Sequence, residues 1–235
     1  MLNDVLDKVR AECTDEAGNE DKKKLGTTFE NMVVRYLTTD PIQKQGITKL
    51  YLWSTFPHRY ALTRGQDTGI YIVAETENER EYIAIQCKCY AKDSTVVLDD
   101  LGNFFNLSGK KFFINNIECK FTRRIFVATT NKWTKHAEDS FNNQDPPASR
   151  ITLKNLEESG VDWEKIYEGL SGERARSKIH KLFDYQEAAL KAVCEHLKDH
   201  DRCKLIMSLV KINNLLKKHP RLTRTANSKF FIFSN

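Results

Sequence analysis

Two polar side chains at alternate positions of an apolar segment have the residue types and spacing to perform chemistry. Gln86 and Lys88 lie within residues 82–90, which are rich in strand-forming side chains. Successive side chains of a strand point to opposite faces, so these two share one face while Ile85 and Cys87 occupy the other. An amide carbonyl can bind a hard cation, and a lysine beside that cation can stabilise developing negative charge.

A carboxylate stands just before the neighbouring strand-like segment. Asp67 ends a polar loop, and residues 69–74 follow it with a strand composition. The polar residues 75–81 suit a hairpin loop between this segment and residues 82–90. We therefore expect two core strands joined as a hairpin, with Asp67 at its entrance.

A second carboxylate, Glu30, lies in a segment with helical periodicity. Thr27 or Thr28 is expected to cap this helix, because a hydroxyl accepts hydrogen bonds from the first turn. A helix passing behind the hairpin can add a further carboxylate to a site there. The apolar positions that define the helix are Phe29, Met32, Val33, Tyr36 and Leu37.

These residue types match the needs of phosphodiester hydrolysis. That reaction uses a divalent metal to bind the phosphate and lower the pKa of the attacking water, and Mg²⁺ prefers oxygen ligands. We expect Glu30, Asp67 and Gln86 to hold Mg²⁺, and Asp67, Gln86 and Lys88 to form the catalytic set. Two alternatives remain open: Asp67 could only shape its turn, and Glu30 could be a solvated helix residue.

The elements that must position these residues alternate between strands and helices. That order indicates an α/β domain with a central mixed sheet. Strands are expected at 47–53, 69–74, 82–90, 123–129 and 150–153, and helical segments from 27 to 37 and at 99–107, 133–142, 153–159 and 185–198.

The composition is that of a globular protein without a membrane segment. The 235 residues are 40% hydrophobic and 29% charged. No apolar run approaches the roughly 20 residues that cross a bilayer, and the N-terminus lacks an apolar signal core. A cytoplasmic protein is expected. Cys87 and Cys89 form a CxC, but no second Cys/His pair at ligand spacing completes a zinc site.

Five segments resemble known nucleases. Residues 26–30, 65–74 and 82–90 look like the Mrr-like branch of the PD-(D/E)xK nucleases, which uses Gln where other branches use Asp or Glu. Residues 128–141 and 155–163 resemble the nuclease domain of Type ISP restriction-modification enzymes. The resemblance implies a restriction-endonuclease-like fold, a central mixed sheet flanked by helices, with Mg²⁺-dependent cleavage of double-stranded DNA. In those enzymes a superfamily 2 helicase and a methyltransferase follow on the same chain.

Tyr71 departs from the pattern of that family. The family has Asp, its principal metal ligand, at this position. A phenol with a pKa of about 10 is a poor Mg²⁺ ligand. Either Asp67 takes over as ligand or the site is weakened, and we favour a weakened site. The alternatives to an endodeoxyribonuclease are a catalytically inactive DNA-binding remnant and the product of a disrupted gene without a stable role.

The C-terminal part resembles the start of a superfamily 2 helicase. Residues 183–189 and 204–207 carry this resemblance, but residues 208–211 stand where the family has its phosphate-binding loop, and no glycine follows Gly172. We therefore expect a helicase cut short at its start, with no ATP site and no ATPase activity. Gln186, which would read adenine in that family, has no nucleotide to read.

Basic residues are concentrated at the C-terminus. The net charge is +5, and residues 204–235 hold seven basic and no acidic side chains. The expected divisions are an N-terminal helix and polar loop (1–25), the nuclease domain (26–166), a linker with the helicase start (167–207), and a poorly ordered basic tail (208–235). Contacts to DNA phosphates are expected from Lys110, Lys111, Lys217 and Lys218.

Overall fold

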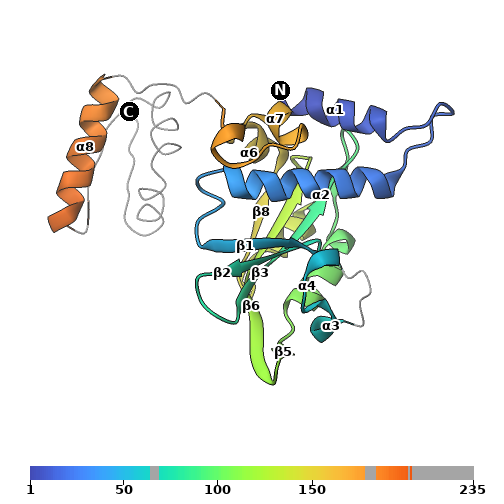
Figure 1. The fold of residues 1–235 in the computed structure, drawn as a ribbon, viewed down its shortest axis with the longest axis horizontal. Coiled ribbons are helices and arrows are strands. Elements are labelled where there is room, and N and C mark those ends of the chain that lie inside the picture. Colours follow the sequence, from blue (N-terminus) through green and yellow to red (C-terminus); the bar gives the residue numbers. More distant parts are fainter. Residues whose placement is uncertain (64–68, 178–183, 201, 203–235) are drawn as a thin grey trace.

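A mixed sheet flanked by helices forms the centre of the molecule, as expected from the sequence (Figure 1). The computed structural model describes residues 1–63, 69–177, 184–200 and 202. Asp67, Lys217, Lys218 and the tail expected over 208–235 lie outside these residues, and so do residues 204–207 of the segment expected to begin the helicase.

The six-stranded sheet has the order β1-β2-β3-β6-β5, and β8 pairs with β6. β1 with β2, β2 with β3 and β5 with β6 are antiparallel, whereas β6 is parallel to both β3 and β8. The expected hairpin is therefore confirmed as β2 and β3, with β3 inside the sheet. The strands are β1 (Ile47–Leu52), β2 (Ile72–Thr76), β3 (Glu81–Lys88), β5 (Phe112–Ile114), β6 (Ile117–Ala128) and β8 (Ala148–Ile151).

Two long helices cover one face of the sheet. α1 (Leu2–Glu12) and α2 (Lys22–Thr39) pack there with the short helices α6 (Leu153–Glu157) and α7 (Trp163–Tyr167). We call the resulting hydrophobic cluster the α2-side core. Tyr36 stacks on Trp163 in this core, with ring centroids 5.4 Å apart. The N-terminal helix thus packs in the same core as the rest of the domain.

The opposite face is covered by short elements and aromatic side chains, which form the α4-side core. Its helices are α4 (Gly102–Ser108), α3 (Arg59–Leu62) and the 3-10 turns η1 (Trp53–Thr55) and η2 (Leu98–Asp100). A second, two-stranded sheet lies near them, formed by the parallel strands β4 (Thr95–Val96) and β7 (Lys132–Trp133). The members of this core with large rings include Trp53, Phe56, Tyr82, Phe104, Phe112, Phe121 and Phe126.

The predicted start of the second helix is wrong. α2 begins at Lys22, and Thr27 and Thr28 lie inside it instead of capping it. The cap is Asp21, whose carboxylate accepts a hydrogen bond of 2.9 Å from the backbone N–H of Lys24. Asp is a stronger N-cap than Thr, and the earlier start also buries Leu25 in the α2-side core.

The helix predicted at 133–142 is also shorter than expected. Trp133 belongs to β7, and Thr134 caps a five-residue helix, α5 (Lys135–Asp139). The Thr134 hydroxyl accepts from the backbone N–H of Ala137 at 3.3 Å, which fixes this start. The aromatic ring of Trp133 packs on Phe126 and Phe141, so tertiary packing places it in a strand.

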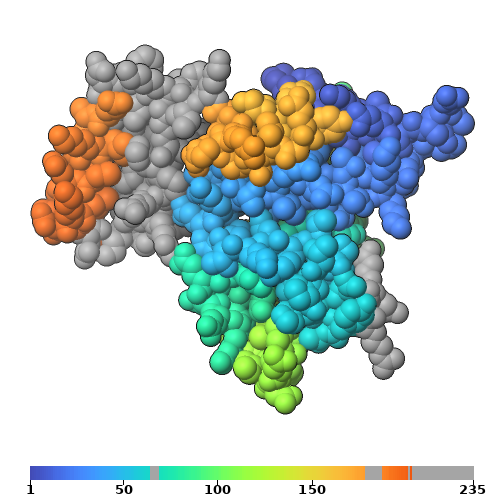
Figure 2. Space-filling view, in the orientation of Figure 1, coloured from blue at the N-terminus to red at the C-terminus, as the bar shows by residue number. Residues whose placement is uncertain are grey.

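The strand predicted at 123–129 is part of a longer hairpin. β6 spans Ile117–Ala128 and pairs with β5. Asn115 and Asn116 form the turn that connects the two strands, and their φ values are 50° and 64°. Two consecutive left-handed residues form the tight turn that suits the twist of a hairpin. This hairpin projects from one end of the body (Figures 1 and 2).

The helix predicted at 185–198 is confirmed as α8 (Asp184–Asp199), which follows the 3-10 turn η3 (Gly172–Ala175). Among the described residues, no helix is long and apolar enough to span a membrane.

Candidate active site

Gln86 and Lys88 share one face of β3, as the sequence predicts. Their neighbours Ile85 and Cys87 are buried in the α2-side core. Ala84, two residues before Gln86, belongs to the α4-side core. Because strand side chains alternate, Gln86 and Lys88 point to the α4 side.

Tyr71 stands just before β2, where the ladder with β3 is irregular. The antiparallel register pairs Ile72 with Ile85. The backbone N–H of Tyr71 also donates to the Ile85 carbonyl, at 3.0 Å, so Tyr71 and Ile72 both stand against Ile85. Ile70 lies in the α4-side core and Ile72 in the α2-side core, so the alternation of faces is interrupted at Tyr71. The hairpin thus brings Tyr71 next to the strand that carries Gln86 and Lys88.

The side chain of Gln86 is buried with an unpaired carbonyl oxygen. Gln86 is 3% exposed, and among the described residues its Oε1 has no hydrogen-bond partner. Gly69, at φ +82°, lies against it: a Cβ at Gly69 would stand 3.5 Å from Gln86 Nε2 and 3.4 Å from the backbone N of Phe104. The first turn of α4 thus approaches the Gln86 carboxamide, and Gly69 allows the approach.

Lys88 forms an ion pair that the sequence analysis missed. Its Nζ lies 2.5 Å from Asp100 Oδ1, and the two side chains are 30% and 21% exposed. The other oxygen of Asp100, Oδ2, accepts a hydrogen bond of 3.1 Å from the backbone N–H of Val97. Asp100 ends η2, just before α4. Asp100 lies inside the segment 99–107 that was expected to be helical, and no local pattern there marked it as a partner of Lys88.

The electrostatics of this pair favour the charged carboxylate. Partial burial raises the pKa of Asp100, but hydrogen bonds from Lys88 and from the Val97 amide outweigh it, so the pKa is lowered from its ordinary value. Tyr90 lies close by. Burial and the carboxylate of Asp100 raise the pKa of its phenol, which therefore stays protonated.

Glu30 approaches from the other side of the sheet. It lies on α2, whose apolar face packs in the α2-side core. Burial of the Cys87 thiol and the charge of Glu30 both raise the pKa of Cys87 well above its ordinary value. Glu30 is therefore close to β3 at Cys87, while Gln86 and Lys88 point away from α2. Asp67 is outside the described residues.

The α4 face carries oxygen atoms of the type that binds a hard cation such as Mg²⁺. Among the described residues, no group of three or more His, Cys, Asp or Glu side chains is gathered in a way that could hold a metal. The Gln86 carbonyl is nevertheless a buried oxygen donor without a partner, and the Asp100 carboxylate lies on the same face. Oxygen donors of these types are those that Mg²⁺ prefers.

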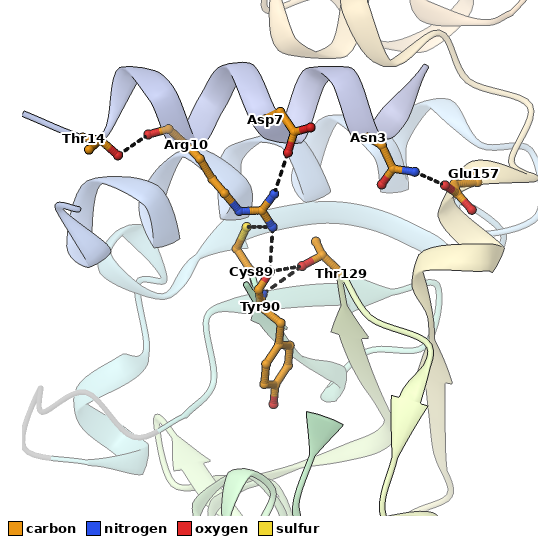
Figure 3. A network of polar contacts seen from close by, with 8 residues as sticks. All are labelled: Asn3, Asp7, Arg10, Thr14, Cys89, Tyr90, Thr129 and Glu157. Carbon is orange, nitrogen blue, oxygen red and sulfur yellow. Dashed lines mark hydrogen bonds and ion pairs between the residues drawn. The ribbon is translucent and has the colours of Figure 1, made fainter. Parts of the chain in front are cut away.

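A network from α1 holds the end of β3 (Figure 3). Nη2 of Arg10 donates to the Tyr90 carbonyl at 2.6 Å. The Thr129 hydroxyl accepts from the Tyr90 N–H at 2.8 Å and donates to the Tyr90 carbonyl at 3.1 Å. The backbone of Tyr90, two residues after Lys88, is therefore held by hydrogen bonds from Arg10 in α1 and from Thr129, the residue after β6.

Two of the predicted DNA-binding lysines lie among the described residues. Lys110 and Lys111 are exposed residues between α4 and β5. Lys111 Nζ forms an ion pair of 2.8 Å with Glu118 on the neighbouring strand.

Comparisons with known proteins agree with this fold. A sequence model described as a restriction endonuclease, Mrr_cat_2, matches residues 38–173, more than half of the chain. Among solved structures, the chain is similar to the ATP-dependent Type ISP restriction-modification enzyme LlaBIII bound to DNA, with 25% identity over 93% of this chain and a TM-score of 0.58. The chain spans 13% of the length of that enzyme.

A second solved structure, the MspJI restriction endonuclease in complex with a 27-mer oligonucleotide, matches with 11% identity over 65% of this chain and 29% of the other, at a TM-score of 0.37. A search of curated proteins finds no match.

Proposed function

Since the chain belongs to the Mrr_cat_2 family of restriction endonucleases, we propose that it hydrolyses phosphodiester bonds of double-stranded DNA and uses Mg²⁺ as its cofactor. The observation that carries this proposal is the buried, unpaired carbonyl of Gln86 on the same face as Lys88. Leaving a buried acceptor unpaired costs about 1–3 kcal/mol, so its retention in a core strand favours a role in binding.

In this proposal Gln86 and Asp67 hold the metal, whereas Glu30, which approaches β3 at Cys87 from the α2 side, does not share it. Bound Mg²⁺ supplies a Lewis acid that lowers the pKa of the attacking water. Gln86 contributes a neutral oxygen from a strand buried in the sheet, so its position is fixed before substrate arrives. Lys88 presents an ammonium group, with three N–H donors, to the negative charge that develops on the phosphate.

Lys88→Ala tests this assignment. Supercoiled plasmid is incubated with the protein and Mg²⁺, and nicked product is followed on a gel, with a chelator as the metal-free arm. We expect cleavage to fall by at least about a hundredfold in the variant, because the charged donor is lost. Lys92→Ala, an exposed lysine four residues later, removes the same charge and should cleave as the parent does. Equal cleavage by Lys88→Ala and the parent contradicts the proposal.

A second candidate function is DNA binding without cleavage. Tyr71 provides no carboxylate at the start of β2, where the resembled nucleases have Asp, and this observation favours a weakened or inactive site. In that case DNA affinity, measured by fluorescence anisotropy, is retained while the parent nicks plasmid no faster than Lys88→Ala does.

The DNA surface is proposed to include Lys110 and Lys111, with Lys217 and Lys218 from the tail. The DNA-bound state of the similar Type ISP structure supports a DNA partner. Each phosphate neutralised by a lysine releases counterions, so binding weakens with salt. Lys110→Ala should reduce the slope of the logarithm of the binding constant against the logarithm of salt concentration by about one. Lys111 should contribute less, because Glu118 already pairs with it.

A further inference from the structure

Position 71 lacks the acidic group that the metal site would need, but the α4 face of the sheet has a carboxylate from elsewhere in the chain. Asp100, twelve residues after Lys88, reaches that face from η2 and pairs with Lys88 at 2.5 Å. We propose that Asp100 supplies the carboxylate ligand of a divalent cation on this face, in place of the side chain at position 71. This inference rests on the proposed function and names a ligand of the same site.

The carboxylate of Asp100 is held in place and has lone pairs left. Oδ1 accepts from Lys88 Nζ, and Oδ2 accepts from the Val97 amide. Each carboxylate oxygen has two lone-pair sites, so these two bonds leave half of its accepting capacity. The side chain is 21% exposed, which lets a cation reach it from solvent.

A second, independent observation points to a ligand here. The Oε1 atom of Gln86 is buried and unpaired on the same face. The turn at Gly69 and the backbone of Phe104 in α4 pack around the Gln86 carboxamide, and η2 leads directly into that helix. The same covering segment therefore places Asp100 beside Lys88 and closes over Gln86.

The charges of the side chains on this face also favour Asp100 as the ligand. Lys88 contributes one positive charge and Gln86 is neutral, so these two side chains alone would repel a divalent cation. Asp100 neutralises the ammonium group and adds an anionic oxygen. Its ion pair with Lys88 also fixes the ammonium group next to where the cation would lie.

Binding of Mn²⁺ to the full chain, measured by isothermal titration calorimetry without DNA, tests the proposal independently of cleavage. Asp100→Asn is expected to weaken Mn²⁺ binding by at least about tenfold, because an amide replaces the anionic ligand. Asp99→Asn is the matched control: it removes the same charge from the exposed neighbouring residue and should bind as the parent does.

Two further variants separate metal binding from a purely structural role. Lys88→Met should retain Mn²⁺ binding, since the carboxylate remains and a positive charge is lost. The double variant Lys88→Met/Asp100→Asn leaves no unpaired charge in the fold and should lose that binding. Unchanged Mn²⁺ binding in Asp100→Asn or in the double variant overturns the proposal, while plasmid cleavage by the parent would still support the proposed function.

The reverse outcome is also informative. Mn²⁺ binding that depends on Asp100, in a parent that never cleaves DNA, sustains this inference and overturns the proposed function. Absence of Mn²⁺ binding in the parent overturns both.

Discussion

Tyr71 donates its backbone N–H to the Ile85 carbonyl at 3.0 Å, one residue before Gln86 on β3. Tyr71 therefore stands at the start of β2, next to the strand that carries Gln86 and Lys88. The covering helix α4 begins two residues after Asp100, which pairs with Lys88.

Tyr71→Asp should increase Mg²⁺-dependent nicking of plasmid DNA by about tenfold or more, because it adds an anionic group where the resembled nucleases have their Asp ligand. Rates are compared by gel at equal protein concentration. Tyr71→Phe, which adds no ligand, is the control and should not gain activity. Adding Lys88→Ala to Tyr71→Asp should remove the gain. A Tyr71→Asp protein that folds and cleaves no faster than the parent contradicts our assignment of this position.

Gln86→Met should separate stability from metal binding. It removes an unpaired buried acceptor and keeps a similar volume, so the free energy of unfolding in the presence of a chelator should rise by about 1 kcal/mol. Urea denaturation measures this change. The same variant should lose the stabilisation that added Mn²⁺ gives the parent, since ligand binding stabilises only where a site exists. A clear fall in stability with chelator present would show that the carboxamide has a structural partner.

Arg10→Met should loosen the end of β3. The charged hydrogen bond to the Tyr90 carbonyl is lost, which we expect to lower the free energy of unfolding by about 1–2 kcal/mol. The rate of DNA cleavage should fall further than the smaller fraction of folded protein accounts for. The reason is that Lys88, two residues before Tyr90, would be held less firmly. Asp7→Asn is the control, since the Asp7 side chain is 70% exposed and its pair with Arg10 contributes little. Equal stability of the two variants would show that α1 docks through its apolar face alone.

Asn116→Ala should destabilise the β5–β6 hairpin by about 1 kcal/mol, because alanine tolerates the left-handed conformation less well than asparagine. Asn116→Gly should be close to neutral, since glycine adopts positive φ without a steric penalty. Urea denaturation of both variants checks the pair. Equal destabilisation by Ala and Gly would mean that the Asn116 side chain, and not its backbone conformation, stabilises the turn.

Local patterns predicted the central strands of the sheet but missed β5. Alternating apolar residues predicted the β2–β3 hairpin and the common face of Gln86 and Lys88, because strand periodicity depends on the chain alone. The helix start failed because Asp21 stands six residues before the first residue of the expected helix, and a polar stretch concealed the earlier first turn. The Asn115-Asn116 pair was a readable turn signal that we overlooked.

The site was predictable only in part. Gln86 and Lys88 lie on one strand, so their relation follows from the sequence. Asp100 reaches Lys88 only because η2 and α4 fold across the sheet, and no local period expresses that approach. Arg10 likewise meets Tyr90 through a contact between residues 80 positions apart. Long-range contacts of this kind arise from tertiary packing, which sequence spacing does not encode.

The two cores on opposite faces of the sheet have a consequence for heredity. The α2-side core contains the apolar faces of α1 and α2, and Tyr71 is not among its members. Under the proposed function, a mutation at position 71 would change cutting without exposing the protein to degradation as an unfolded chain. Codons for tyrosine and aspartate differ by a single nucleotide. A lineage carrying this gene would then lower its nuclease activity and regain it by one reversion, while the folded protein persists throughout.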